Sequence, residues 1–134
     1  MLSQGDVIRI PDNPRDPQDK HCHVIISYPD KDPDNVVLVP IDTYDDDRQD
    51  DTCILEPHDS PGRAYVQHRS YIEYRKGSVT AVAVLEAKIK NKAFSKKTPI
   101  GAVALEKILA GAKDAAESSL PNKCSVILLK QSLI

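Results

Sequence analysis

Short runs of β-branched and other aliphatic residues, separated by segments rich in Pro and Asp, occupy the first two-thirds of this 134-residue chain. Runs of this length and spacing are typical of strands joined by turns. No helical period interrupts them. The pattern therefore predicts a small, strongly bent β-barrel over residues 1–90, rather than a parallel sheet with helical crossovers. At this length the whole chain, residues 1–134, is expected to form a single domain.

The strands are expected in six segments, in the order Gly5–Ile10, His21–Ser27, Val36–Ile41, Thr52–Glu56, Ala64–Tyr74 (with a bend near Gln67) and Val79–Ile89. Between them, residues 11–19 hold three prolines and predict an exposed loop, and residues 42–51 predict an acidic loop. The second and third strands flank a turn rich in Pro and Asp, which indicates an antiparallel hairpin.

A helical period replaces the alternation over residues 98–134. Thr98 is expected to cap a helix that has Pro99 in its first turn, and Pro121 is expected to end it. The segment after Pro121 fits either a short helix or a strand, and we favour the helix. The sequence thus predicts a mainly β domain with one long and one short helix at its C-terminal end.

The composition restricts both the core and the cellular setting. With one Phe and no Trp, the core must be largely aliphatic. The three cysteines (Cys22, Cys53 and Cys124) lack any C-x-x-C spacing, so we expect reduced, mostly buried thiols, which favours a cytoplasmic location. No apolar run approaches 18 residues and no signal-peptide pattern is present, so no membrane association is expected.

Charge is distributed unevenly along the chain. Residues 1–67 carry 6 Lys and Arg against 15 Asp and Glu, a net charge of −9. Residues 68–134 carry 12 against 5, a net charge of +7, so the whole chain has a net charge of −2. If the fold kept these halves apart, a basic face would be available for phosphate groups. If the halves interleave, the asymmetry cancels.

Several segments resemble the PemK/MazF family of toxin endoribonucleases. The similar segments, which together lie within roughly residues 5–110, are Gly5-Asp6-Val7, His23-Val24-Ile25-Ile26-Ser27-Tyr28-Pro29, Val37-Leu38-Val39-Pro40-Ile41-Asp42-Thr43 and His68-Arg69-Ser70-Tyr71-Ile72. The resemblance implies an SH3-like barrel that forms homodimers. It also implies cleavage of single-stranded RNA without a metal or other cofactor, and a partner antitoxin protein.

The typical catalytic pair of that family is an Arg before the P-A-V-V-L strand and a Thr at the end of the V-P-x-T strand. Here Lys20 or His21 stands at the position of the Arg, and Asp42, followed by Thr43, stands at the position of the Thr. The resemblance therefore leaves two alternatives. Either the nuclease uses histidine, or the protein is an inactive barrel that binds protein or RNA.

Metal-free RNA cleavage needs a base for the 2′-hydroxyl and an acid for the leaving 5′-oxygen, and histidine suits both roles because its ordinary pKa is near 6.5. His21 and His23 are two apart on a predicted strand, so their side chains share one side. The candidate catalytic residues are His21, His23, Thr43 and His68. The candidate substrate-binding residues are Lys20, His58, Arg63, Arg69 and Ser70. The simpler alternative is that these histidines are ordinary surface residues.

Two other patterns bear on metal and RNA binding. The His21-x-His23 pair would bind a metal only with a third ligand such as His58, His68 or an aspartate, and the acidic run over residues 45–51 lacks the Gly and Glu of a calcium-binding loop. Lysines are densest over residues 88–97, at positions 88, 90, 92, 96 and 97. On a strand they would either follow an RNA backbone or form a solvated edge that resists aggregation.

Overall fold

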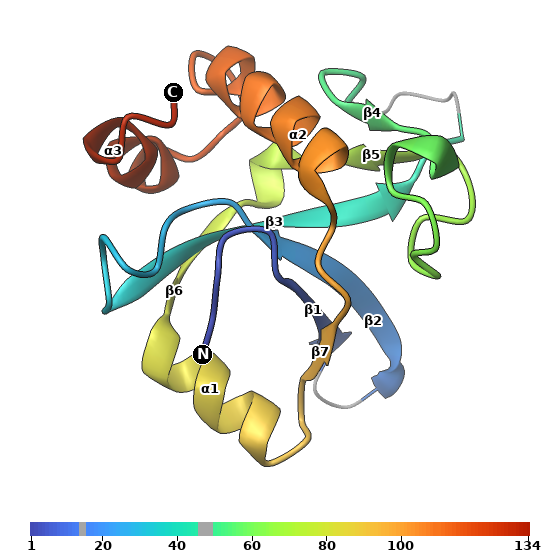
Figure 1. Ribbon diagram of the computed structural model, residues 1–134, viewed down its shortest axis with the longest axis vertical. Coiled ribbons are helices and arrows are strands. Elements are labelled where there is room, and N and C mark those ends of the chain that lie inside the picture. Colours follow the sequence, from blue (N-terminus) through green and yellow to red (C-terminus); the bar gives the residue numbers. More distant parts are fainter. Residues whose placement is uncertain (14–15, 46–49) are drawn as a thin grey trace.

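The computed structural model describes residues 1–13, 16–45 and 50–134. Within them, seven strands form one antiparallel sheet in the order β4-β5-β3-β2-β1-β7, with β6 paired to β3 outside this path (Figure 1). The strands are β1 (Val7–Asn13), β2 (Asp16–Ile25), β3 (Asn35–Thr43), β4 (Ile54–Leu55), β5 (Ser70–Ile72), β6 (Ser78–Ala81) and β7 (Ser95–Lys97). The two ends of this path do not pair, so the described sheet is not closed into a barrel.

Strand β3 is the most connected strand of the described sheet, because it pairs with three others. One edge pairs with β2, and the other pairs with β6 near its start and with β5 near its end. Pro40 lies at the point where β6 gives way to β5, and its carbonyl accepts a hydrogen bond from the Glu73 amide at 3.1 Å. A proline lacks the N–H that a central strand needs. Here it is tolerated because the neighbouring chain turns away through the 3₁₀-helix η2 (Tyr74–Lys76).

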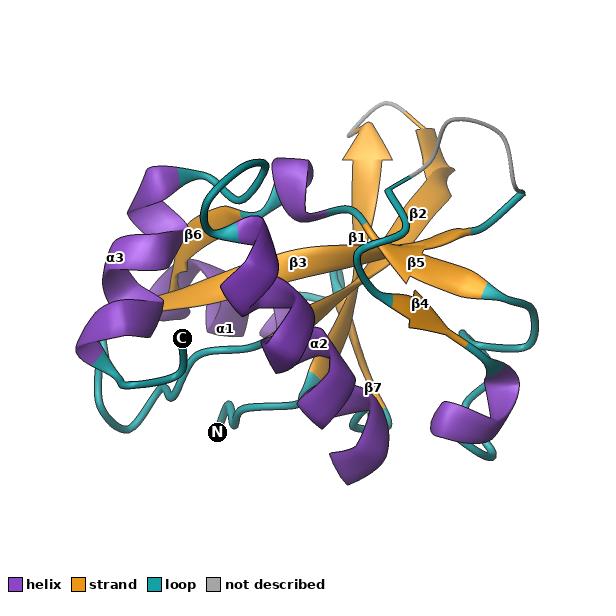
Figure 2. Ribbon diagram, turned by 90° about the horizontal axis from the view of Figure 1, so that it is seen from above, coloured by secondary structure: helices purple, strands orange, loops and turns teal. Residues whose placement is uncertain are grey.

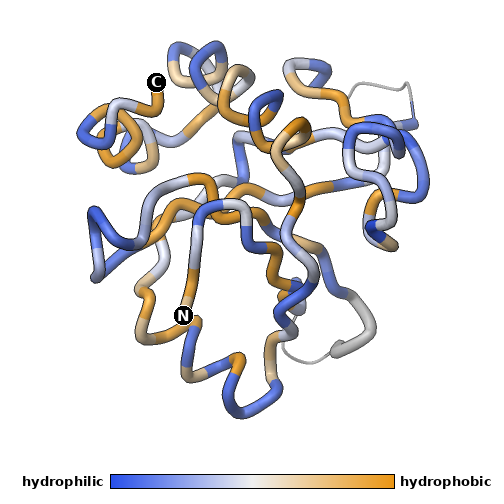
Figure 3. The backbone as a smooth tube through the Cα atoms, viewed as in Figure 1, coloured by the Kyte–Doolittle hydropathy of each residue, from blue (hydrophilic) through white to orange (hydrophobic). Residues whose placement is uncertain are grey.

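The two faces of the sheet bury separate aliphatic clusters. Alternate residues such as Val7, Val24 and Val39 belong to the larger cluster, which packs against α2 (Ala102–Ala115) and α3 (Asn122–Lys130). Their neighbours in sequence, such as Ile8 and Ile25, belong to the smaller cluster with α1 (Val82–Lys90). Figures 1 and 2 show α1 on the opposite side of β3 from α2 and α3. In Figure 3 the hydrophobic segments gather where strands and helices meet.

The predicted strand Val79–Ile89 is wrong beyond Ala81, because the chain there forms helix α1. Residues 82–90 (VAVLEAKIK) contain Ala, Leu, Glu and Lys, which favour helix. Val82, Leu85 and Ile89 share one helical face and pack in the smaller cluster. Apolar residues also occupy alternate positions from Val79 to Ile89, a period of two, so the sequence pattern fits a strand as well as a helix. The structure therefore has three α-helices where two were predicted, and β7 follows the first of them unpredicted.

Other boundaries also differ from the prediction. The loop expected over residues 11–19 is largely strand, because β1 continues to Asn13 and β2 begins at Asp16; residues 14–15 lie outside the described part. The strand expected over Ala64–Tyr74 is reduced to β5, since residues 64–69 form turns. Helix α2 begins after Gly101 rather than Thr98, because the Ile100 amide donates to the Gly5 carbonyl at 2.9 Å and keeps residues 98–100 extended.

The C-terminal end follows the prediction more closely. Residues 122–130 are the helix α3, which confirms the preference for helix over strand after Pro121. Gln131 is buried and joins α3 to the end of the β2 segment, because its side chain accepts from the Tyr28 amide at 2.6 Å and donates to the Tyr28 carbonyl at 3.2 Å. The cysteines are free, and Cys53 and Cys124 are buried as expected. Across the described residues, no helix has the length and apolar character needed to cross a membrane.

Candidate functional site

Both faces of the sheet change from apolar to polar at the same end. On the side of the sheet that faces α2, the apolar side chain of Val7 on β1 is followed by Arg9. On the same side of β2, Val24 is followed toward the strand's start by Cys22 and Lys20. On the α1 side, the alternation through Ile25 continues to His23 and His21. Since side chains alternate strictly along a strand, cations emerge on one face and histidines on the other. The candidate site therefore lies across the rim of the sheet where β1, β2 and β3 meet.

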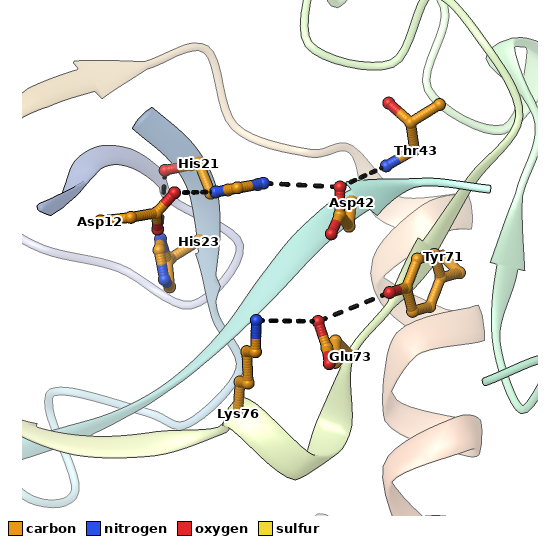
Figure 4. Close-up of polar contacts among 8 residues, drawn as sticks. All are labelled: Asp12, His21, His23, Asp42, Thr43, Tyr71, Glu73 and Lys76. Carbon is orange, nitrogen blue, oxygen red and sulfur yellow. Dashed lines mark hydrogen bonds and ion pairs between the residues drawn. The ribbon is translucent and has the colours of Figure 1, made fainter. Parts of the chain in front are cut away.

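His21 stands between two carboxylates at this rim (Figure 4). Its Nδ1 atom is hydrogen-bonded to Oδ2 of Asp12, and its Nε2 atom lies 3.4 Å from Oδ1 of Asp42. The same Asp42 oxygen accepts the Thr43 amide at 2.8 Å, which fixes its position. Burial lowers the pKa of His21, but the hydrogen bond and charge of Asp12, with the charge of Asp42, outweigh it and raise the pKa above its ordinary value.

His23 has the opposite electrostatic environment. Burial is the main influence and lowers the pKa of His23; a backbone hydrogen bond to His21 and the charge of Asp12 act against it, and the charge of His21 adds the smallest effect, also lowering the pKa. Its Nδ1 atom lies 3.2 Å from the carbonyl oxygen of His21. A carbonyl only accepts, so Nδ1 is the donor and Nε2 of the neutral ring keeps its lone pair. The two histidines are thus neighbours with their pKa values moved in opposite directions.

A cleft of about 400 Å³ opens on the α2 side of the rim. Its lining consists of Arg9, Lys20, His21, Cys22, Ile41, Asp42, Thr43, Ala64, Tyr65, Ser70 and Lys97. A smaller pocket of about 200 Å³ opens on the other side and is lined by Asp12, His21, His23, Pro40, Asp42, Glu73 and Lys76. His21 and Asp42 line both cavities. They therefore stand between the basic cleft and the smaller pocket that contains His23.

Five of the residues predicted for the site converge on these two cavities, namely Lys20, His21, His23, Thr43 and Ser70. Thr43 and Ser70 are register partners between β3 and β5, so both face the cleft on the α2 side. The Ser70 hydroxyl donates to the His68 carbonyl at 2.9 Å. Cys22 also lines the cleft, and burial raises the pKa of its thiol in spite of the nearby Arg9 and Lys97.

The other four predicted residues lie outside both cavities. His58 is 81% exposed in η1 (Pro57–Asp59), with Nε2 at 3.7 Å from Asp59, and His68 is exposed in the turn before β5. Arg63 is held by the backbone carbonyls of Pro61 and Pro99, each at 2.8 Å. Arg69 pairs with Glu56 at 2.6 Å. The sequence pattern alone did not distinguish these side chains from those at the rim.

The side chains of the site that the sequence did not indicate include Arg9, Asp12, Tyr65 and Lys97. Asp12 was assigned to a loop, whereas the β1–β2 register pairs Pro11 with Lys20 and thereby brings Asp12 to His21. A prediction that extended the β1–β2 hairpin through the prolines would have revealed the contact between Asp12 and His21. Lys97 reaches the cleft because β7 pairs with β1, a pairing that no short-range signal in the sequence indicates.

The residues grouped at the rim do not make a metal site. Among the described residues, no three His, Cys, Asp or Glu side chains are close enough together to hold a metal ion, so the His21-x-His23 pair has no described third ligand. Asp46 and Asp47 of the predicted acidic loop lie outside the described residues. The predicted lysine series is divided, because Lys88 and Lys90 are on α1 and Lys96 pairs with Asp6 at 3.2 Å.

Comparison of the chain with protein-family models and with curated protein sequences finds no match.

Proposed function

We propose that this protein is a metal-independent endoribonuclease that cleaves single-stranded RNA, with His21 and His23 as its proton-transfer pair. The observation that carries the proposal is the position of His21, which is held by Asp12 on one nitrogen and directs the other to a rim shared by two cavities. A carboxylate on Nδ1 orients an imidazole and stabilises its protonated form. The arrangement is suited to general acid–base chemistry near neutral pH.

His21 is assigned as the acid. Both of its ring nitrogens face carboxylate oxygens, and carboxylates accept but do not donate, so the ring carries both protons. The Nε2 contact to Asp42 at 3.4 Å is the looser of the two, so this nitrogen is the one able to give its proton to a substrate. In the reaction, Nε2 protonates the 5′-oxygen as the bond from phosphorus to that oxygen breaks.

His23 is assigned as the base. Its Nδ1 donates to the His21 carbonyl, and its Nε2 lone pair is available to take the proton of the 2′-hydroxyl. The 2′-oxygen then bonds to phosphorus, and the products are a 2′,3′-cyclic phosphate and a 5′-hydroxyl end. Pairs of titratable groups whose surroundings move their pKa values apart are the usual basis for such acid and base assignments.

The resemblance to the PemK/MazF family supports the same proposal. Lys20 or His21 stands where that family has its catalytic Arg and Asp42 where it has its Thr, and all three residues line one cleft. We propose that the bent sheet is an open form of the SH3-like barrel, and that the protein acts as a homodimeric toxin neutralised by an antitoxin. One feature supports the barrel: β6 and β5 share one edge of β3 with a 3₁₀ turn between them.

A binding module without catalysis is the second candidate. The observation that favours it is that His21 has a carboxylate at each ring nitrogen, which satisfies the side chain without any substrate. In that case Asp12, His21 and Asp42 stabilise the β1–β2–β3 corner, and the basic cleft binds RNA or protein without cleaving it.

The deciding experiment is incubation of the purified protein with mixed single-stranded RNA in the presence of EDTA, followed by mapping of both new ends. The proposal expects discrete cuts with 2′,3′-cyclic phosphate ends. His21→Gln and His23→Gln should each reduce the rate by about 10²- to 10⁴-fold. Lys123→Gln on the exposed face of α3 is the matched surface control and should cleave at the wild-type rate. Intact RNA at high protein concentration would favour the binding module.

His68→Gln separates this mechanism from one that uses the other predicted histidine. Because His68 lies outside both cavities, its replacement should leave the cleavage rate within a few-fold of wild type. A loss as large as that of His21→Gln would show that the turn before β5 moves into the site, and the assignment of His23 as base would be wrong.

A further inference from the structure

We propose that Arg9, Lys20 and Lys97 form a binding subsite for a phosphodiester of an extended nucleic-acid strand, on the α2 side of the rim that carries His21. This inference rests on the proposed function, since it gives the substrate a position next to the proton-transfer pair. None of the family motifs quoted above includes Arg9 or Lys97.

The three cations come from three neighbouring strands. Arg9 is opposite Cys22 in the β1–β2 register, and Lys20 is two residues from Cys22 on β2, so all three side chains share one face. Lys97 pairs with Val7, two residues before Arg9, and therefore faces the same way. The charges of Arg9 and Lys97 both act on the Cys22 thiol, which places them around a common point in the cleft.

Among the described residues, these three cations have no partner that neutralises them. Within the part of the chain that the structure describes, Arg9, Lys20 and Lys97 form no ion pair and no side-chain hydrogen bond. By contrast, the neighbouring Lys96 is paired with Asp6, and Arg63 and Arg69 are held in place. Three unpaired cations at one cleft, in a protein with net charge −2, indicate an anionic ligand.

The cleft also suits a phosphate group more than a carboxylate. Asp42 is the only carboxylate among its described lining residues, and it is turned toward His21 and the Thr43 amide. Hydroxyl groups of Thr43, Tyr65 and Ser70 complete the lining. Arg and Lys supply the charge that phosphate oxygens need, whereas the hydroxyls of Tyr65 and Ser70 already donate to the backbone carbonyls of Thr98 and His68.

An extended strand fits the site better than a single small anion. The cleft and the smaller pocket lie on either side of His21 and Asp42, which line both. The smaller pocket contains Asp12, Asp42 and Glu73 against Lys76 and the histidines, so it does not favour a second phosphate. A strand whose phosphodiester lies among the cations would therefore place its sugar hydroxyl toward the rim and the histidines.

The test is binding of a fluorescent all-2′-deoxy single-stranded decamer, which has no 2′-hydroxyl and cannot be cleaved by the proposed reaction. Anisotropy is measured over a range of salt concentrations for the wild type and for Arg9→Gln, Lys20→Gln and Lys97→Gln. Each replacement should weaken binding several-fold. Each should also reduce the slope of log K against log salt by about 0.7, the value for one contact to a single strand. Lys123→Gln is the control and should leave both quantities unchanged.

The outcomes separate this subsite from the catalytic proposal. If the decamer binds through the three cations but RNA is never cut, the subsite stands and the endoribonuclease is wrong. If RNA is cut but the three variants bind the decamer as the wild type does, the subsite is wrong. Inorganic phosphate is the second probe: displacement of the decamer by phosphate at the decamer's own concentration would indicate a site for free phosphate, and would overturn the extended strand.

Discussion

Nε2 of His21 and Oδ1 of Asp42 lie 3.4 Å apart at the end of the β2–β3 pair, where the strand register pairs Cys22 with Ile41 but does not extend to these two residues. The contact exists because His21 and Asp42 are the next residues outward from the pair Cys22–Ile41 on the two strands. It brings an imidazole and a carboxylate together at the one place that two cavities share. The chemistry of the site can therefore be tested through these two residues and their neighbours.

The rate of RNA cleavage should follow a bell-shaped pH profile. A base must be deprotonated and an acid protonated, and the pKa of His23 is lowered while that of His21 is raised. Both groups are then in the active form between the two values, a range that includes pH 6.5. The measurement is the rate at saturating RNA from pH 4 to 10. A profile that rises steadily with pH would exclude His21 as the acid.

Asp12→Asn should move the alkaline limb of that profile to lower pH. The carboxylate of Asp12 is the main influence that raises the pKa of His21 against burial, and Asn retains the size but not the charge. Loss of the neighbouring carboxylate charge should move the alkaline limb by about one pH unit. Asp30→Asn, an exposed change in the turn before β3, is the control. An unchanged limb would show that Asp12 does not act on His21 in solution.

The Asp12–His21 contact should also stabilise the fold in a pH-dependent way. The pKa of His21 is higher in the folded state than in the unfolded chain, so the stabilisation is fully present below the unfolded value. The stabilisation is lost as the pH rises through the pKa of His21 in the folded protein. The difference in free energy of unfolding between the wild type and His21→Gln should accordingly be larger at pH 5.5 than at pH 9. Urea unfolding at both pH values measures it, and an equal difference would contradict the raised pKa.

Gly111→Ala should destabilise the protein even though Ala is the better helix former. A Cβ atom at Gly111 would lie 2.2 Å from the Tyr74 hydroxyl oxygen and 3.0 Å from Cβ of Cys53. Such overpacking costs about 1–3 kcal/mol in a buried helix. Tyr74→Phe removes the obstructing oxygen, at the expense of its 2.7 Å hydrogen bond to the Ile108 carbonyl. The double variant should therefore recover part of the loss in thermal unfolding; additive losses would mean that the clash lies elsewhere.

Asp59→Asn should reduce stability at neutral pH and have little effect in acid. Asp59 is buried, and although burial raises its pKa, the Lys107 ammonium and the Glu56 amide outweigh it and lower the pKa. The stabilisation is then present at pH values above the pKa of Asp59 in the unfolded chain, and it is lost as the pH falls through the pKa of Asp59 in the folded protein. We expect a loss of about 1–3 kcal/mol at pH 7. A constant difference down to pH 3 would contradict this account.

The parts of the fold that the sequence could predict are those fixed by local pattern. The strands around Val24 and Val39 and the helix containing Ile108 were predicted because apolar runs and helical spacing are local signals. Helix α1 was not predicted, because the apolar residues of this segment fit the period of a strand as well as that of a helix. Only packing against Ile8 and Leu38 decides for the helix. The barrel predicted over residues 1–90 is wrong as to closure, because closure depends on the pairing of strand ends far apart in the chain, which no local pattern reveals.

The same division holds for the site. His21 and His23 share one side because of strand alternation, which the sequence does predict. Lys20, Thr43 and Ser70 were recognised by type and by the family resemblance. Arg9 and Lys97 could not be recognised, since a cation becomes part of a cleft only when the sheet places it opposite a partner.

Strand β3 has a consequence for how the chain folds as it is synthesised. Its aliphatic residues leave the ribosome well before β5 and β6, which must cover its second edge. Until residue 81 has emerged, that edge offers unpaired backbone groups beside one of the most apolar segments of the chain. The nascent protein therefore passes through a stage at which chaperone binding competes with aggregation, and residues 44–69 set how long that stage lasts.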